Sequence, residues 1–487
     1  MDDFEKLGFT EYEGKPYTYF FNEEIFRIIL IPKSVEEQDN AYFKQLETFG
    51  PDKRKNEWIP NNVIRGMKLG THSEILFSLL DNPSTRNGIA QYPVNWCIEL
   101  PMNADVSIID GIEVIGGDAN RFYSPNHILE KEFKTDSFSV RANIKESVDC
   151  GTFDFDDCRK CTVSVLPYAS VKPYDYEKPV SATTQVRFEL SKPINLEGAR
   201  KLYQDIYDLF MYLSCRSNIQ FDTIRLIWKR PIQGYPKNHV YGNIHFPAKK
   251  KSIDDENKQK QFISSEHLSK HTADLVSFIH QGKVGFQFIC DTAAKRNSYP
   301  PSRIIAICTE FEREFRNVYG TDVLRHDIYK ETKEEIVKLL DSKADDETGK
   351  KRQYIKSFSR SVSNFDDSYG QRVRYAMEQN ETILKPFLDT FFRDELSELK
   401  EGIPDRLNDI RNGLAHSRLD FELTPVNLSD IEVLEILTYI IVLQQFLEPL
   451  NVQKAINDLF GFHLFFGDDT KNGEINEPEK AEEEETT

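Results

Sequence analysis

Asp409-Ile-Arg-Asn-Gly-Leu-Ala-His-Ser417 is the stretch of this 487-residue chain that indicates most about its fold and its chemistry. It places a permanent cation (Arg411), an amide (Asn412) and an imidazole that titrates near neutral pH (His416) within six residues. Apolar residues flank them at helical spacing: Leu407, Ile410, Leu414 and Leu419. The stretch therefore predicts a helix that carries three functional groups.

The angular positions of these groups on a helix decide how they can act together. Asn412 and His416 are four residues apart and share one face of an ideal helix. Arg411 and His416 are five residues apart, so the step of about 100° per residue separates them by about 140°. A site that uses both is completed most easily by a second copy of the helix across a two-fold axis. We therefore expect a homodimer formed through the C-terminal domain.

The Arg-x4-His spacing, with Asn directly after Arg, resembles the signature of the HEPN superfamily. These small helical domains often act as metal-independent ribonucleases and usually dimerise around the motif. The resemblance covers roughly residues 300 to 465. A long β-rich region before the helical domain resembles the layout of the ApeA-like bacterial anti-phage proteins. In HEPN ribonucleases the matching Arg and His are taken to be catalytic, which implies the same roles for Arg411 and His416.

The residue types suit cleavage of RNA without a metal ion or a cofactor. In RNA a 2′-hydroxyl adjoins each phosphodiester, so a base such as His416 can remove its proton while Arg411 stabilises the phosphoryl oxygens. Asn412 is expected to orient His416 or the phosphate. The resemblance implies an anti-phage defence protein that cleaves tRNA or another cellular RNA, causes abortive infection and responds to a phage protein.

Two alternatives to the ribonuclease remain open at this point. Some HEPN domains bind nucleotides or partner proteins without cutting RNA, so the chain could carry a non-catalytic regulatory module. The motif could also be a plain structural helix, with an exposed Arg411 and a hydrogen-bonded His416. The complete Arg-Asn-x3-His pattern favours the enzyme.

The charge of the chain limits how it could bind RNA. The formal net charge is −18, which argues against broad, charge-driven binding to nucleic acid and calls for a local basic patch. The best candidate runs from Lys350 to Ser363 and contains no acidic residue. Its cations, assigned to RNA phosphates, are Lys350, Lys351, Arg352, Lys356 and Arg360, and its rings, assigned to bases, are Tyr354 and Phe358. The alternative is an ordinary solvated loop or helix edge.

The N-terminal half of the chain favours β-strands. Short runs of β-branched and aromatic residues recur, and several alternate apolar with polar side chains, as from Val186 to Leu190. One helix interrupts them, opened by Asn195 and extending to about Cys215 with a continuous apolar stripe. These patterns predict an antiparallel β sandwich or barrel-like domain with one covering helix, which would act as a sensor or regulator.

The C-terminal half predicts a helical bundle. Ser302 is expected to cap its first helix and Gly320 to end it. A long helix is expected from about Tyr369 to Lys400, bent at Pro386. The fold class is therefore α+β, with a β-rich N-terminal domain followed by an all-α HEPN-like bundle. The predicted parts are a β-rich domain (1–247), a linker with a short helical segment (248–299), a HEPN domain (300–466) and an acidic disordered tail (467–487).

The seven cysteines, scattered and odd in number, fit a reducing cytoplasm better than a disulfide framework. The first residues lack the cationic start and apolar run of a secretion signal. We therefore expect a cytoplasmic protein. Cys150, Cys158 and Cys161 leave a zinc site open, because Cys-x2-Cys is a common zinc-binding element. No second pair or nearby histidine accompanies them, so surface or core thiols are favoured.

Overall fold

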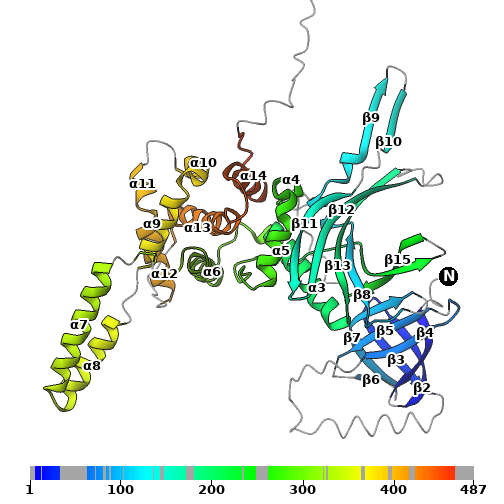
Figure 1. Ribbon diagram of the computed structural model, residues 1–487, viewed down its shortest axis with the longest axis horizontal. Helices are drawn as coiled ribbons and strands as arrows, with labels where there is room; N and C mark the ends of the chain where they lie inside the picture. Colours follow the sequence, from blue (N-terminus) through cyan, green and yellow to red (C-terminus); the bar gives the residue numbers. More distant parts are fainter. Residues whose placement is uncertain are drawn as a thin grey trace, which may run out of the picture. The chain divides into compact units, whose positions relative to one another are not determined.

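The computed structural model places the chain in two compact units, residues 1–298 and 299–487. The first unit is β-rich and the second is helical (Figure 1), so the predicted α+β fold class is confirmed. Among the residues that the structure describes, no helix is both long enough and apolar enough to cross a membrane. The described residues are 6–12, 14–32, 63–71, 73–80, 84–86, 89–101, 104–134, 137–142, 147–171, 180–232, 235–247, 261–321, 323–324, 327–363, 368–392, 397–415 and 423–466. The predicted acidic tail lies outside them.

A closed antiparallel barrel begins the first unit and is drawn mostly in blue in Figure 1. Hydrogen-bonded strands follow the order β7-β3-β2-β1-β4-β5, and β5 pairs again with β7, which closes the ring. The barrel-like alternative of the sequence prediction is therefore the one that the chain adopts. The strands are β1 (Leu7–Tyr12), β2 (Lys15–Asn22), β3 (Arg27–Pro32), β4 (Val63–Lys68), β5 (Glu74–Leu79) and β7 (Ile89–Leu100).

Alternation along the strands fills this barrel with apolar side chains. In β3, Ile28 and Leu30 are buried, and Ile29 between them is half-buried. The ring of Tyr19 crosses the interior beside Gly66, where an added Cβ would lie 2.7 Å from a ring carbon. Glycine at this position therefore makes room for the ring. The core consists of Tyr19, Phe21, Phe26, Ile28, Leu30, Ile64, Ile75, Phe77, Leu79, Val94 and Cys97.

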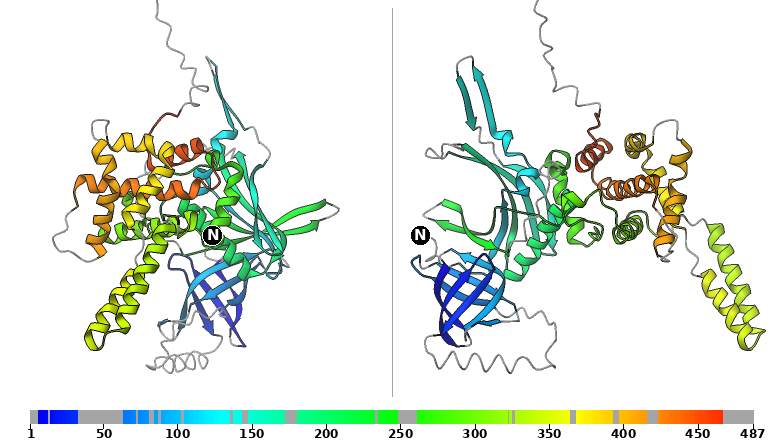
Figure 2. Two further views of the ribbon diagram at one scale, coloured as in Figure 1. Left: turned by 60° about the vertical axis from the view of Figure 1, so that its left-hand side comes forward. Right: turned by 180° about the vertical axis from the view of Figure 1, so that it is seen from behind.

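The same sheet continues beyond β7 as an open antiparallel layer (Figure 2). Its order from β7 outward is β15, β14, β8, β13, β12 and β11. Two strands form a separate hairpin, β9 (Leu129–Lys134) with β10 (Ser137–Ala142), and short β6 (Ser84–Arg86) pairs with β7. The strands of the open layer are β8 (Ile109–Ile115), β11 (Val148–Asp156), β12 (Arg159–Val171), β13 (Val180–Ile194), β14 (Thr223–Ile232) and β15 (Tyr235–His245).

The predicted covering helix is α3 (Leu196–Ser214), which packs against β8 and β13. Asn195 caps it as expected, because its side chain accepts a hydrogen bond from the Gly198 amide at 3.0 Å. A further helix, α5 (Thr272–His280), packs on α3 and β11. Its His280 Nδ1 lies 2.7 Å from Asp205 Oδ2 of α3, so the two helices are joined by a polar contact as well as by apolar packing.

The second unit is built around α13 (Pro425–Leu443), whose side chains from Val433 to Leu443 are all buried. Around it pack α6, α9, α10, α12 and α14. A helix with no polar face fits the centre of a bundle, because every side of it meets another helix. The remaining helices are α6 (Pro301–Tyr319), α7 (Asp327–Asp345), α8 (Gly349–Ser363), α9 (Tyr369–Gln379), α10 (Glu381–Phe391), α11 (Ser397–Glu401), α12 (Ile403–Ala415) and α14 (Pro449–Phe460).

Two predicted helix boundaries are wrong. α6 begins at Pro301 without a side-chain cap, so Ser302 lies inside its first turn, although Gly320 ends the helix as expected. The predicted long helix breaks at Asn380, between α9 and α10, and Pro386 lies within α10. Asn380 Nδ2 donates to the Ala376 carbonyl oxygen at 2.8 Å. Such a bond competes with the helical backbone and favours a break at this residue.

Candidate active site around Arg411

The motif lies on α12, as its apolar spacing predicts. Ile403, Leu407 and Ile410 form the buried face, which packs against α6, α9 and α13. Pro404 occupies the first turn, where its missing N–H costs no helical hydrogen bond. The described helix ends at Ala415. His416 lies outside the described residues, and with it the predicted face that it would share with Asn412.

Arg411 and Asn412 interact directly although they are neighbours in sequence. Arg411 Nη1 donates a hydrogen bond to Asn412 Oδ1 at 3.2 Å. Both side chains are half-buried on α12. The amide of Asn412 therefore holds the guanidinium of Arg411. Sequence reasoning assigned Asn412 to His416 or to the phosphate and missed this contact, which depends on side-chain rotamers.

Arg411 differs from the other arginines that are at least partly buried in this unit. Within the described part of the chain, Arg411 has no carboxylate at ion-pair distance. Its permanent charge is therefore not neutralised there and is available to a phosphate, which a guanidinium can bind through two parallel hydrogen bonds. The paired arginines are Arg303 with Glu435 (2.7 Å), Arg313 with Glu310 (3.4 Å), Arg372 with Glu312 (2.9 Å) and Arg406 with Asp430 (2.7 Å).

Two buried groups lie within electrostatic reach of Arg411. Burial raises the pKa of the Cys308 thiol on α6 to about 11, and the positive charge of Arg411 acts in the opposite direction. Burial also raises the pKa of the Tyr369 hydroxyl on α9, again opposed by Arg411. Both groups are therefore neutral at physiological pH. Neither group therefore supplies an anion that would neutralise the guanidinium of Arg411.

A buried ion pair fixes α12 to the centre of the bundle. Arg406 Nε and Nη2 donate to the two carboxylate oxygens of Asp430 on α13, both at 2.7 Å. Asp430 is fully buried, and burial raises its pKa while Arg406 lowers it. Arg406 Nη2 also donates to the Leu399 carbonyl oxygen at 2.7 Å. This pair joins the motif helix to α13 in addition to the apolar packing, and no local sequence pattern signals it.

Loss of this ion pair should destabilise the helical unit strongly. Arg406→Met leaves the Asp430 carboxylate buried without its partner, and we expect the free energy of unfolding to fall by about 3 kcal/mol or more. Urea denaturation followed by circular dichroism measures the change. The control is Arg374→Met, whose pair with Asp405 is exposed and should contribute at most about 1 kcal/mol. Equal losses in both variants would show that the buried pair does not anchor α12.

All five cations predicted to contact RNA lie on α8, which packs against α7 as an antiparallel hairpin (Figure 1). Two of them have acidic partners: Lys351 Nζ lies 2.5 Å from Glu347, and Arg352 Nη2 lies 3.2 Å from Asp345. No ion pair is found for the other three within the described part of the chain: Lys350, Lys356 and Arg360.

The rings of α8 do not share a face with most of its cations. Tyr354 and Phe358 are 65% and 60% exposed. By the helical step of about 100°, they lie roughly 120° to 160° round the helix from Arg352, Lys356 and Arg360, and within about 80° of Lys350 and Lys351. Ser359, which donates to Asp341 of α7 at 2.6 Å, marks the side that faces α7. Arg352, Lys356 and Arg360 therefore form a cationic stripe that faces away from the two rings, and Lys350 and Lys351 lie on the side of the rings.

The three cysteines weighed as zinc ligands occupy different environments. Cys150 in β11 and Cys161 in β12 are buried, and Cys158 is exposed in the turn between the two strands. Burial raises the pKa of Cys150 to about 12 and raises that of Cys161 as well. Over the described ranges, no group of three or more His, Cys, Asp or Glu side chains is arranged to hold a metal ion.

Comparison of the chain with protein-family profiles, with curated proteins and with solved structures gives no match. What the protein does is therefore inferred from its own residues. The strongest of these are Arg411, which has no ion pair within the described ranges, Asn412, which holds it, and His416, which follows α12 in the sequence.

Proposed function

We propose that this protein is a metal-independent endoribonuclease of the HEPN type that acts in anti-phage defence. The observation that carries the proposal is the half-buried Arg411, which is held by the amide of Asn412 and has no carboxylate at ion-pair distance in the described ranges. The position of His416, five residues after Arg411, supplies the titratable group that the reaction needs. The resemblance of the motif to HEPN ribonucleases supports the same assignment.

In the proposed reaction His416 removes the proton from the 2′-hydroxyl of RNA. The 2′-oxygen forms a bond to the adjacent phosphorus, and the bond between phosphorus and the 5′-oxygen breaks. The leaving 5′-oxygen takes up a proton, so the products are a 2′,3′-cyclic phosphate and a 5′-hydroxyl. Arg411 stabilises the charge that accumulates on the phosphoryl oxygens, and Asn412 keeps the guanidinium in place.

The proposed biological role follows from the damage that such a ribonuclease would do to the RNA of its own cell. A ribonuclease that cuts tRNA or another cellular RNA stops growth, so infection would end with the infected cell. The enzyme must be inactive until infection, and the β-rich unit offers a means of control through a phage protein. Purified protein incubated with total RNA, with and without extract of infected cells, tests this directly when the cut ends are sequenced. Bound but uncut RNA under both conditions would favour a non-catalytic binding module.

On one ideal helix Arg411 and His416 point about 140° apart. This separation predicts that each site combines residues from two chains. Light scattering at micromolar concentration should show a dimer. Mixing an Arg411→Ala chain with a His416→Ala chain should restore activity, because a mixed dimer contains one site with both wild-type residues. Random pairing makes half of the dimers mixed, so about a quarter of the wild-type activity should return.

The control for this experiment is each variant alone, which has no complete site in any pairing. A strict monomer with full activity would contradict the shared site. So would a stable mixed dimer that remains inactive, because that result would place Arg411 and His416 of one chain in the same site.

The cationic stripe of α8 is proposed to hold RNA. Lys356→Glu with Arg360→Glu should weaken RNA binding and lower the slope of log affinity against log salt by about 1.4, since each phosphate contact on a single strand contributes about 0.7. Filter binding across a salt series measures the slope. The matched control is Lys330→Glu with Lys343→Glu on α7, which makes the same charge change on the neighbouring helix. An unchanged slope in the α8 variant would leave this helix as an ordinary solvated edge.

A further inference from the structure

The antiparallel hairpin of α7 and α8 carries apolar side chains that no other described helix covers (Figure 1). The two helices pack closely on each other, and neither has an extensive contact with any other described helix. Large apolar side chains of the hairpin are 44% to 76% exposed at Ile328, Ile336, Leu339, Tyr354 and Phe358. Exposed apolar side chains that gather on one surface mark a site that meets a partner.

The helical step places these side chains on one face of the hairpin. Leu340 is half-buried and Ser359 is buried and donates to Asp341 of α7 at 2.6 Å, so these residues mark the contact between the helices. Leu339 precedes Leu340, and Phe358 precedes Ser359, so each lies about 100° from the contact in the same rotational sense. Because the two right-handed helices run in opposite directions, that rotation brings both side chains to the same face. The others lie within about 60° of these two on their own helices, and together they form the apolar face: Ile328, Ile336, Leu339, Tyr354 and Phe358.

The apolar face is separate from the cationic stripe that is proposed to hold RNA. That stripe points about 120° to 160° away from the two rings. Of the two cations on the side of the rings, Lys351 is paired with Glu347 at 2.5 Å. The α7 side of the face is aliphatic, and aliphatic side chains neither pair with phosphates nor stack on bases as rings do. The face therefore suits another protein surface better than it suits RNA.

The charges of the two helices favour a second copy of the hairpin as that surface. α7 contains six acidic and four basic residues, a net charge of −2, whereas α8 contains five basic residues and no acidic one, a net charge of +5. When two hairpins meet face to face, α7 of each chain can lie on α8 of the other, which brings opposite charges together. The other two-fold arrangement lays α8 on α8, where ten cations repel one another.

We propose that the α7–α8 hairpins of two chains form an antiparallel four-helix bundle, with α7 of each chain on α8 of the other. A two-fold axis parallel to the helices generates this bundle, and every helix is then antiparallel to both of its neighbours. Leu339 of one chain lies within about one helical turn of Phe358 of the other, because the bond from Ser359 to Asp341 fixes the relative level of α7 and α8. Helices gain most of their stability from packing of an apolar face, and the second hairpin supplies that packing.

This contact does not depend on RNA cleavage. None of its residues belongs to the candidate active site on α12. The contact gives the proposed dimer a surface of its own, and it leaves the cationic stripe on the opposite side of the hairpin free for RNA.

Disulfide cross-linking of the full-length protein tests the arrangement. The two chains are Leu339→Cys and Phe358→Cys, both with Cys158→Ser, because Cys158 is the exposed native cysteine. Co-expressed and mildly oxidised, they should give a covalent dimer that a reducing agent separates. Either chain alone should give at most a trace, because identical positions lie on diagonal helices of the bundle, too far apart for a disulfide. A mixture without the cross-link would overturn the proposal, and so would an equal yield from Leu339→Cys alone.

A second measurement tests the strength of the contact. Leu339→Asp with Phe358→Asp should raise the dissociation constant of the dimer at least about a hundredfold, since a symmetric contact loses four apolar groups and gains four like charges. Sedimentation velocity over a concentration series measures the constant, and circular dichroism shows that the helices persist. The matched control is Lys330→Ala with Gln353→Asp, which makes the same charge change about 140° to 180° round each helix and should dimerise as the wild type does.

Unchanged dimerisation of the Leu339→Asp, Phe358→Asp chain would reject the contact. If that chain also bound RNA more weakly than the wild type, the apolar face would belong to an RNA site instead.

Discussion

His416→Ala and Arg411→Ala should each abolish RNA cleavage and phage protection while the protein stays folded. Proton transfer by a positioned side chain typically contributes about 10² to 10⁴ in rate, so loss of the imidazole should leave almost no activity. Loss of the guanidinium removes the charge that stabilises the phosphoryl oxygens. Cleavage of total RNA and plating efficiency of phage measure the two effects, and circular dichroism shows whether the helical unit persists.

A second variant tests whether the proposed activity depends on an Arg411 that has no ion pair within the described ranges. Asn412→Asp replaces the amide that holds Arg411 with a carboxylate, so that Arg411 becomes ion-paired like its neighbours Arg372 and Arg406. We expect activity to fall nearly as far as in Arg411→Ala, because the guanidinium is then neutralised. The control is Asn408→Asp, which places the same charge one turn earlier on α12. Full protection by folded His416→Ala or Asn412→Asp protein would remove the basis of the catalytic assignment.

The products of the reaction should carry 2′,3′-cyclic phosphates and 5′-hydroxyls, and cleavage should persist in EDTA. The proposed nucleophile is the 2′-hydroxyl, so one 2′-deoxy substitution at the cut site should block cleavage there, and DNA should not be cut. A metal-dependent nuclease activates water instead and can leave a plain 5′-phosphate. End-specific ligation and mass spectrometry of the fragments distinguish the two chemistries.

The control for the deoxy substitution is a 2′-deoxy residue one nucleotide away from the cut site, which keeps the nucleophile and should be cleaved. Two results would show that His416 is not the base. One is inhibition by EDTA of protein that remains folded and bound to RNA. The other is a set of products with 5′-phosphates.

Local sequence patterns were sufficient for the elements whose cause is local. The helical spacing of Leu407 and Ile410 predicted the motif helix, and the side chain of Asn195 predicted the start of α3. Gly320 ended α6 as expected, with φ at 85°. Each depends on residues within one or two turns, so the short-range preferences of the backbone decide the outcome. The α+β division follows from the same periodicities summed along the chain.

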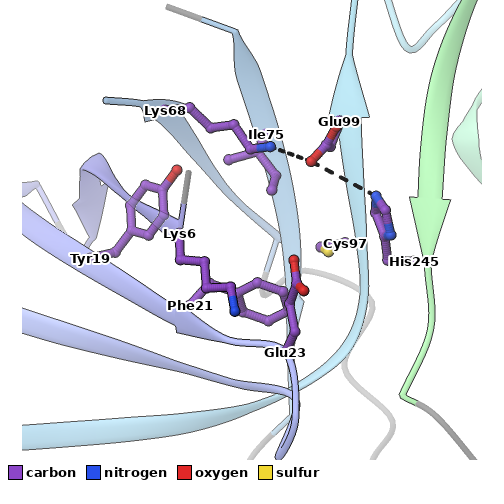
Figure 3. A pocket seen from close by; sticks show the side chains of 9 residues that line it. All are labelled: Lys6, Tyr19, Phe21, Glu23, Lys68, Ile75, Cys97, Glu99 and His245. Atoms are coloured by element: carbon purple, nitrogen blue, oxygen red, sulfur yellow. Dashed lines mark hydrogen bonds and ion pairs between the residues drawn. The ribbon is translucent and has the colours of Figure 1, made fainter. Parts of the chain in front are cut away.

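Tertiary contacts decided the rest, because they join residues that no local period connects. The barrel closes only where β5 pairs with β7, and its core gathers residues as distant in sequence as Tyr19 and Cys97 (Figure 3). The sequence suggested a bend at Pro386, but the helix breaks at Asn380, whose side chain also donates to Tyr319 of α6 at 2.8 Å.

The chemistry of the candidate site divides in the same way. The sequence by itself supplied Arg411, Asn412 and His416 and their spacing, since residue types and intervals are visible in one chain. Only the folded bundle decided which arginines meet a carboxylate. Arg406 is paired through Asp430, 24 residues away on another helix, and Arg411, one helical turn and a residue later, is held by an amide. Charge compensation depends on distance in space, so the difference between these two arginines exists only in three dimensions.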